Sequence, residues 1–234
     1  MTTTTPTPLQ RAERVLDEAL ATYRGKIALA CSFGGPAGMV LLDLVVARDR
    51  SVPVYYLDTG LLFESTYALV DRVRERYGIE PIAVRPELTV AQQAARFGEA
   101  LWARDPDACC ALRKVEPQRA FLAGYDAWIT GIRRDQSSSR ANAQTISRDV
   151  NAGGIAKIAP LADWTSADVW SYVMAHDVPY NPLNDRGFPS LGCTHCTRAI
   201  VPGEDPRAGR WSGIEKLECG LHASTTAHGA NGTS

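Results

Sequence analysis

The sequence lacks a long hydrophobic run, a signal peptide and a strong excess of charge. No stretch approaches the roughly 18 consecutive apolar residues that a membrane-spanning helix needs. Residues 1–8, MTTTTPTP, have neither the basic segment nor the apolar core of a secretory signal, so we expect a disordered leader there. A formal net charge of −1 provides no overall positive field for nucleic acid. We therefore expect a cytoplasmic protein with no nucleic-acid and no membrane partner.

The composition is that of an ordinary globular protein. Of the 234 residues, 45% are hydrophobic and 22% are charged, so the chain can bury a core without disulfides. We expect one domain over 9–222, followed by a flexible tail over 223–234 that is poor in hydrophobic residues. Six cysteines in a chain without an export signal favour free thiols or a metal site over disulfides.

Short apolar runs alternate with amphipathic stretches along the first half of the chain. The pattern predicts strands at 26–31, 52–57, 79–84 and 126–130, and helices at 9–23, 39–46, 63–77 and 165–176. Such alternation is typical of βαβ units, so we predict an α/β fold with a Rossmann-like, mostly parallel sheet.

Ligands of parallel sheets bind beyond the carboxyl ends of the strands. The turns at 32–35, 58–60 and 131–134 follow predicted strands, and we expect them to converge on one site. Residues 178–222 are rich in proline, glycine and cysteine and have little periodicity, so we expect them to complete that site.

Four of the cysteines form two pairs. Cys109 and Cys110 are adjacent, and Cys193 and Cys196 form a C-x-x-C motif about 80 residues later. Four thiolates select zinc or an iron–sulfur cluster. Adjacent cysteines suit a cluster, which has several corners, better than a single zinc ion, but zinc stays the alternative. A thioredoxin-like dithiol is disfavoured because the C-x-x-C motif lies in a late loop.

The two remaining cysteines differ in their surroundings. Cys219 lies in Glu-Cys-Gly-Leu-His, close to a histidine, and is a candidate nucleophile because a thiolate is the attacking form. Taken alone, Cys219 could equally be structural. Cys31 lies in a predicted strand and is expected to be a small core residue.

Basic residues gather near the glycine-containing turns. Arg133, Arg134 and Arg140 follow a predicted strand, whereas Arg207 and Arg210 lie in the late segment. Lys114 follows the adjacent cysteines. Because guanidinium groups match phosphate and sulfate oxygens in pairs, this grouping predicts an anion site.

Seven segments, taken together, resemble the assimilatory sulfonucleotide reductases. They are Leu57-Asp-Thr-Gly60, Cys109-Cys110-x-x-Arg113-Lys114, the Arg133–Arg140 run, Tyr180-Asn-Pro-Leu183, Gly192-Cys-Thr-His-Cys-Thr-Arg198, Gly203-Glu-Asp-Pro-Arg-Ala-Gly-Arg-Trp211 and Glu218-Cys-Gly-Leu-His222. The resemblance covers about residues 25–222 in order. Members of the family with paired cysteines are adenylyl-sulfate reductases that carry a [4Fe-4S] cluster.

The resemblance implies an adenine nucleotide α-hydrolase-like fold and the thioredoxin-dependent reduction of adenosine 5′-phosphosulfate to sulfite and AMP. This reaction belongs to sulfate assimilation for cysteine biosynthesis. By resemblance, Cys219 is the nucleophile, which becomes S-sulfocysteine before thioredoxin or glutaredoxin releases sulfite. One [4Fe-4S] cluster per chain would be held by Cys109, Cys110, Cys193 and Cys196. The substrate would be bound by Ser32, Phe33, Gly34, Gly35, Leu57, Lys114, Arg133, Arg134, Arg140, Arg207, Arg210 and His222.

Two departures from the family pattern keep alternatives open. The turn at 32–38 lacks the acidic pair common in relatives, and His195 replaces a proline, so we expect His195 beside the metal site but not as a ligand. A reductase of the 3′-phosphorylated nucleotide is the first alternative, because Arg133 and Arg134 could meet the extra phosphate. An ATP pyrophosphatase or thiolation enzyme of the same fold is disfavoured by the incomplete Ser-Gly-Gly turn.

Overall fold

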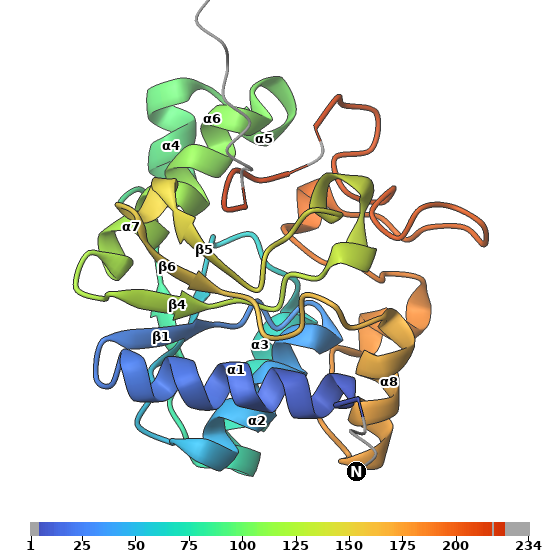
Figure 1. The fold of residues 1–234 in the computed structure, drawn as a ribbon. Coiled ribbons are helices and arrows are strands. Elements are labelled where there is room, and N and C mark those ends of the chain that lie inside the picture. Colours follow the sequence, from blue (N-terminus) through green and yellow to red (C-terminus); the bar gives the residue numbers. More distant parts are fainter. Residues whose placement is uncertain (1–4, 217, 223–234) are drawn as a thin grey trace, which may run out of the picture.

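The structure, a computed structural model, describes residues 5–216 and 218–222 and is built around a six-stranded sheet (Figure 1). In spatial order the strands are β3 (Ile82–Val84), β2 (Val54–Leu57), β1 (Ile27–Ala30), β4 (Ala127–Ile129), β6 (Ile155–Ile158) and β5 (Ile146–Asp149). All neighbours pair in parallel except β5, which is antiparallel to β6. The predicted α/β class with a mostly parallel sheet is confirmed.

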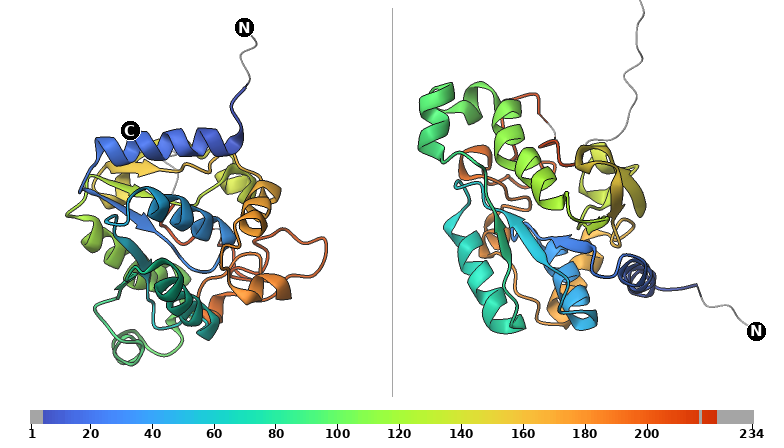
Figure 2. Two further views of the ribbon diagram at one scale, coloured as in Figure 1. Left: turned by 90° about the horizontal axis from the view of Figure 1, so that it is seen from below. Right: turned by 90° about the vertical axis from the view of Figure 1, so that its left-hand side faces the viewer.

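Helices cover both faces of this sheet (Figure 2). The longer ones are α1 (Pro8–Thr22), α2 (Pro36–Arg48), α3 (Glu64–Tyr77), α4 (Val90–Phe97), α7 (Glu116–Leu122) and α8 (Ser166–Ala175). The shorter helices and helical turns are α5 (Leu101–Arg104), α6 (Pro106–Cys110), the π-helical turn Ala111–Val115, and 3₁₀ turns at Arg134–Gln136, Ser138–Arg140, Val150–Ala152, Pro182–Arg186 and Thr194–Cys196. Within the described residues, no helix is both long and apolar enough to cross a membrane.

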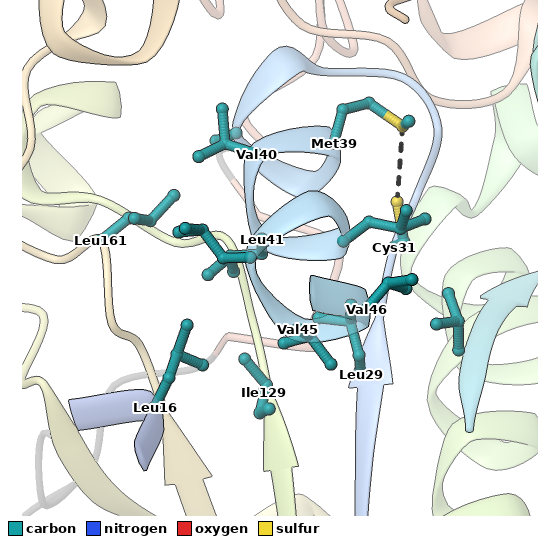
Figure 3. Close-up of a cluster of buried hydrophobic side chains, with 14 of the residues drawn as sticks. Leu16, Leu29, Cys31, Met39, Val40, Leu41, Val45, Val46, Ile129 and Leu161 are labelled. Carbon is teal, nitrogen blue, oxygen red and sulfur yellow. Dashed lines mark hydrogen bonds between the residues drawn. The ribbon is translucent and has the colours of Figure 1, made fainter. Parts of the chain in front are cut away.

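The core lies mainly on the face covered by α1, α2, α3 and α8 (Figure 3). Leu29 and Ile129 point to this face because side chains alternate along a strand. Their neighbours Ala28 and Trp128 point to the opposite face, where they pack with Leu122 of α7. The sheet is therefore buried on both sides, which leaves its carboxyl edge as the place where a ligand can reach it.

Cys31 is a core residue, as predicted. It is 1% exposed, and its Sγ lies 3.8 Å from Met39 Sδ (Figure 3). Burial raises the pKa of the Cys31 thiol to about 12, so the thiol stays protonated near neutral pH.

Side-chain caps set the starts of two helices. At the start of α8, Thr165 and Asp168 form a capping box. A second box joins Thr7 to Gln10 and places Pro8 in the first turn of α1. Thr7 and Pro8 thus belong to the helix, and not to the leader over 1–8 that the sequence predicted. Residues 1–4 and the predicted tail at 223–234 lie outside the described residues.

The sequence analysis missed several short elements. It assigned no strand to β5 or β6 and no helix to α4, α5, α6 or α7. Strands β5 and β6 have four residues each, so the pairing of β6 with β4 and of β5 with β6 has more influence on them than their own propensity does. The short helices α5 and α6 likewise contain too few turns for a clear helical period.

Candidate active site

A cavity of about 370 Å³ opens at the carboxyl edge of the sheet. It lies beside β1, β2 and β4, where the strand order changes direction, which is the usual ligand position in such folds. The late segment at 178–222 contributes Asn184, 189–192 and 206–222 in part. Of the predicted site residues, those that line the cavity are Ser32, Gly34, Gly35, Leu57, Lys114, Arg133, Arg140, Arg207, Arg210, Cys219 and His222.

The first turn forms one wall of the cavity. A Cβ on Gly34 would lie 2.9 Å from Leu191 Cβ, so glycine allows the late segment to close against this turn. Phe33 was predicted to bind substrate, but its side chain is fully buried in the core and packs edge-on against Tyr56. Its backbone has a positive φ of 51°, which turns the ring away from the cavity that Ser32 and Gly34 line.

The turn after β2 faces the cysteines and not the cavity. Leu57 lines the cavity, but the Thr59 hydroxyl lies 3.4 Å from Cys193 Sγ. Asp58 accepts a hydrogen bond from Tyr67 and forms a salt bridge with Arg85. Only two of the three predicted turns, at 32–35 and 131–134, therefore meet at the cavity.

Arg133 and Arg134 lie in different surroundings although they are adjacent. Arg133 lines the cavity, is 7% exposed and donates from Nε to Asp135 Oδ1 at 2.9 Å. The other carboxylate oxygen of Asp135 accepts from the backbone N–H of Ser166 at 2.6 Å. Arg134 is exposed, does not line the cavity and donates to the Ala143 carbonyl. The structure therefore gives the Arg134 side chain no place at this site.

Arg140 and Arg207 meet across the cavity from different segments. Both contact the carboxylate of Glu218, with Arg140 Nε at 2.6 Å and Arg207 NH2 at 3.3 Å. Burial and the positive charge of Arg140 lower the pKa of Arg207 to about 10, so Arg207 stays charged near neutral pH. The pair forms a ready anion site, and the Glu218 carboxylate stands in it where a substrate oxyanion would bind.

Arg210 is anchored by the late segment. Its NH1 donates to Ser190 Oγ at 3.3 Å and to the Leu191 carbonyl at 3.2 Å. The guanidinium also lies 4.5 Å from the centre of the Trp211 ring. These contacts fix the direction of a fourth arginine that lines the cavity, after Arg133, Arg140 and Arg207.

Lys114 brings a fifth positive charge to the cavity. It lies in the π-helical turn, is 8% exposed and lines the cavity. Burial alone would lower the pKa of Lys114, but the nearby thiols of Cys193, Cys219 and Cys110 outweigh it and raise the pKa. The ammonium group therefore remains charged between the cysteines and the cavity.

Cys219 and His222 line the cavity from the C-terminal end of the described chain. The His222 ring stacks on Trp128, with ring centres 5.9 Å apart, and its Nδ1 is buried without a partner in the described chain. Burial and the positive charges of Lys157 and Arg140 hold the pKa of His222 well below its usual value. A neutral His222 can donate or accept a hydrogen bond, but it adds no charge to the anion site.

The two cysteine pairs lie close enough for their thiols to interact electrostatically. Burial raises the pKa of Cys109, Cys110 and Cys196, and Cys193 raises each of them further. All six cysteines are free thiols. Among the described residues, no three His, Cys, Asp or Glu side chains are arranged to hold a metal ion.

Arg113 connects the surroundings of both cysteine pairs. Its Nε donates to the Thr59 carbonyl at 2.6 Å, and its NH1 donates to Gln93 Oε1 at 3.0 Å. Thr59 contacts Cys193, and Gln93 Nε2 lies 3.8 Å from Cys109 Sγ. The ring of His195, expected beside the metal site, packs at a tilt of 33° against that of Trp102 with ring centres 4.2 Å apart, so α5 supports the C-x-x-C turn.

Several cavity residues were missed by the sequence analysis. Tyr55 and Trp128 are aromatic strand residues that look like core from their pattern, yet both line the cavity. The Tyr55 hydroxyl and Trp128 Nε1 are buried without a partner in the described chain. Glu218, which was quoted only as part of a motif, does not line the cavity itself, but its carboxylate contacts two arginines that do.

Comparisons with known proteins agree on one family. The phosphoadenosine phosphosulfate reductase domain matches residues 26–199. The adenosine 5′-phosphosulfate reductase of Halalkalibacterium halodurans is 49% identical over 209 residues, which are 89% of this chain and 90% of that protein.

Solved structures give the same assignment. The phosphoadenylyl-sulfate reductase of Candida auris is 32% identical, with a TM-score of 0.68 over 79% of this chain and 88% of that one. The FMN adenylyltransferase of Candida glabrata shares the fold at 17% identity, with a TM-score of 0.59 over 93% of this chain and 74% of that one. The resemblance found in the sequence motifs is confirmed: the chain belongs to the phosphoadenosine phosphosulfate reductase family.

Proposed function

We propose that this chain reduces adenosine 5′-phosphosulfate to sulfite and AMP, with Cys219 as the nucleophile. The observation that carries the proposal is the position of Cys219 in one cavity with Lys114, Arg140, Arg207 and Arg210. A thiol surrounded by cations can attack a sulfate that those cations hold, because they offset the repulsion between two anions. The similarity to the adenosine 5′-phosphosulfate reductase of H. halodurans supports the same substrate.

In the first step, the Cys219 thiolate attacks the sulfur of the substrate in line with the sulfur–oxygen bond to the phosphate. A sulfur–sulfur bond forms, the sulfur–oxygen bond breaks, and AMP leaves with the bonding electron pair on its phosphate oxygen. Arg140 and Arg207 would hold the oxyanion, since their guanidinium groups already bind a carboxylate there. The adenosine would lie against the first turn, 32–35, and Leu57.

In the second step, a thiol of thioredoxin, or of glutaredoxin, attacks Sγ of the S-sulfocysteine. Sulfite leaves with the electron pair of the sulfur–sulfur bond, and Cys219 enters a mixed disulfide. The second thiol of the reductant then frees Cys219 and leaves the reductant as a disulfide. The two electrons that reduce the substrate sulfur thus come from the dithiol. This chemistry needs a reducing compartment such as the cytoplasm, and it fits sulfate assimilation for cysteine biosynthesis.

A [4Fe-4S] cluster is the cofactor that we propose for Cys109, Cys110, Cys193 and Cys196. The donor set fits, because four thiols from two segments lie within electrostatic range of one another, and thiolates are the usual ligands of such clusters. When bound, the cluster would supply fixed charge beside Lys114 at the anion site. Arg113, through Thr59 and Gln93, would orient both cysteine pairs.

We also propose that the substrate carries no 3′-phosphate. The first turn contributes no Lys or Arg, and Arg134 does not line the cavity. Arg133 does line it, but its guanidinium is already paired with Asp135. A 3′-phosphate would therefore meet a neutralised arginine, which favours adenosine 5′-phosphosulfate over the 3′-phosphorylated form.

The test follows the covalent intermediate. The protein is incubated with adenosine 5′-phosphosulfate without a reductant, and each cysteine-containing peptide is examined by mass spectrometry. We expect a sulfonate adduct on Cys219 and one AMP released per adduct, followed by sulfite release when thioredoxin is added. Cys31→Ser serves as the control and should keep the adduct, whereas Cys219→Ser should lose it. An adduct on Cys31, or none at all, would contradict the proposal.

A further inference from the structure

The carboxylate of Glu218 occupies the anion site that the proposed function assigns to the substrate. Arg140 donates to it from Nε at 2.6 Å and from NH2 at 2.7 Å, in a two-pronged contact. Arg207 NH2 adds a contact at 3.3 Å, and the Ser139 hydroxyl donates at 3.1 Å. The three charged side chains are 11–17% exposed, so this ion cluster is largely removed from water.

The positive charges in this cluster stabilise the ionised form of the Glu218 carboxylate. Burial alone would raise the pKa of Glu218, but the hydrogen bonds and charge of Arg140, together with Arg207, outweigh it and hold the pKa below its usual value. Glu218 is therefore an anion at neutral pH, as a sulfate or phosphate group would be.

Arg140 cannot hold Glu218 and a substrate oxyanion in the same way at once. Two of its nitrogens, Nε and NH2, bind Glu218, and the third, NH1, donates to Gln136 Oε1 at 2.7 Å. The planar fork that fits a carboxylate is the same fork that fits a sulfate. A substrate that binds to Arg140 through this fork must first displace Glu218.

Displacement of Glu218 need not detach the segment that carries it. The Gly220 carbonyl accepts from Asn151 Nδ2 at 2.9 Å, and His222 stacks on Trp128. Cys219 lines the same cavity as Arg140 and Arg207, and both Glu218 and Cys219 act electrostatically on Arg207, so an oxyanion that replaces the Glu218 carboxylate on these arginines lies near Cys219. The exchange therefore brings the sulfur atom to the neighbouring thiol.

We propose that Glu218 is a positioning residue that holds Cys219 at the cavity before substrate arrives and is exchanged for the substrate oxyanion. The inference rests on the proposed roles of Arg140, Arg207 and Cys219. It follows that Glu218 and the substrate compete for the same arginines. In the free protein the Glu218 carboxylate occupies the anion site, and a substrate must break that contact to bind.

Two measurements test the competition. First, the dissociation constant of adenosine 5′-phosphosulfate is measured by calorimetry in a Cys219→Ser background, with and without Glu218→Gln. If the closed form holds about nine-tenths of the molecules, removal of the competing charge should tighten binding about tenfold. Glu215→Gln is the matched control, because Glu215 is an exposed glutamate on the same segment. It should leave the constant unchanged.

Second, the alkylation rate of Cys219 by iodoacetamide is followed peptide by peptide in the absence of nucleotide. Glu218→Gln should speed this alkylation several-fold over the wild type and over Glu215→Gln, while the alkylation of Cys31 stays slow. Weaker substrate binding in Glu218→Gln, or the same binding and alkylation as in Glu215→Gln, would overturn the competition. These readouts need no turnover, so they differ from a failure of the proposed function, which would appear as a missing adduct on wild-type Cys219.

Discussion

Replacing Asp135 by asparagine is expected to weaken the discrimination between the two sulfonucleotides. Asp135 neutralises Arg133, the one arginine of the 131–134 turn that lines the cavity in the described chain. The variant keeps an oxygen that can accept from the Ser166 N–H, so the start of α8 should be preserved. The substitution removes the negative charge beside Arg133, so the Arg133 guanidinium becomes available to a 3′-phosphate.

The size of the effect follows from the burial of the pair. For the wild type we expect kcat/KM to favour the nucleotide without a 3′-phosphate by at least about tenfold, or about 1.4 kcal/mol. A hydrogen bond from a charged group contributes about 1.5–3 kcal/mol. The Asp135 side chain is 31% exposed, so solvent screens part of its charge, and the lower end of that range applies. Asp135→Asn should therefore improve the use of the 3′-phosphorylated nucleotide about tenfold and remove most of the preference.

The assay is a competition at equal concentrations, in which the release of AMP is compared with that of 3′,5′-ADP. Asp163→Asn is the control, since Asp163 pairs with Arg11 on the surface and does not line the cavity. It should leave the product ratio unchanged. Two results would refute the reasoning: a wild type that releases mainly the bisphosphate, or an Asp135→Asn variant in which both substrates change equally.

Three further predictions concern the cysteines, the C-terminal histidine and a helix cap. Cys110→Ser should lower the iron content below one cluster per chain and reduce stability, since metal binding also contributes to folding; full iron content would show that the adjacent pair does not supply two ligands. Because the pKa of His222 lies well below its usual value, an unfolded chain takes up a proton there as pH falls and the folded one does not. The wild type should thus lose about 1 kcal/mol more than His222→Asn between about pH 6.5 and 5.5 in urea unfolding, and equal slopes would contradict this. Thr165→Ala removes a capping box and should cost about 1 kcal/mol of unfolding free energy, against no loss for Thr22→Ala at an exposed threonine of α1.

The parallel strands β1, β2 and β4 could be predicted because each is a short apolar run followed by a turn that contains glycine. The runs at β1, β2 and β4 are buried on both faces, so burial leaves a clear mark in their composition. Strand β6 was missed for a physical reason. Lys157 interrupts its apolar pattern, although its ammonium lies 5.4 Å from the centre of the Trp128 ring and is largely buried there. Residue types alone do not show that a lysine packs against an aromatic ring on a neighbouring strand.

The residue types that line the cavity could be predicted from the sequence, but the directions of the side chains were harder to predict. Several basic residues or cysteines in one short segment stand out in a sequence. Most of the basic residues singled out in this way, together with Cys219, line one cavity. Phe33 and Arg134 were grouped with them by sequence position alone. The direction of a side chain depends on backbone angles, and the positive φ of Phe33 sends its ring into the core while its neighbours Ser32 and Gly34 face the cavity.

Local charge at the cavity differs from the charge of the whole chain, and this difference explains why Glu218 escaped notice. A net charge of −1 excludes a general affinity for polyanions, yet five cations from distant segments line one small space. Crowding them raises the cost of leaving the cavity without an anion, and the pKa of Arg207 is lowered by burial and by the charges of Arg140 and Arg210. A carboxylate on the segment that closes the cavity relieves that repulsion until a substrate arrives. Chain-wide composition averages over this arrangement, whereas the fold creates it by bringing residue 218 to residues 140 and 207.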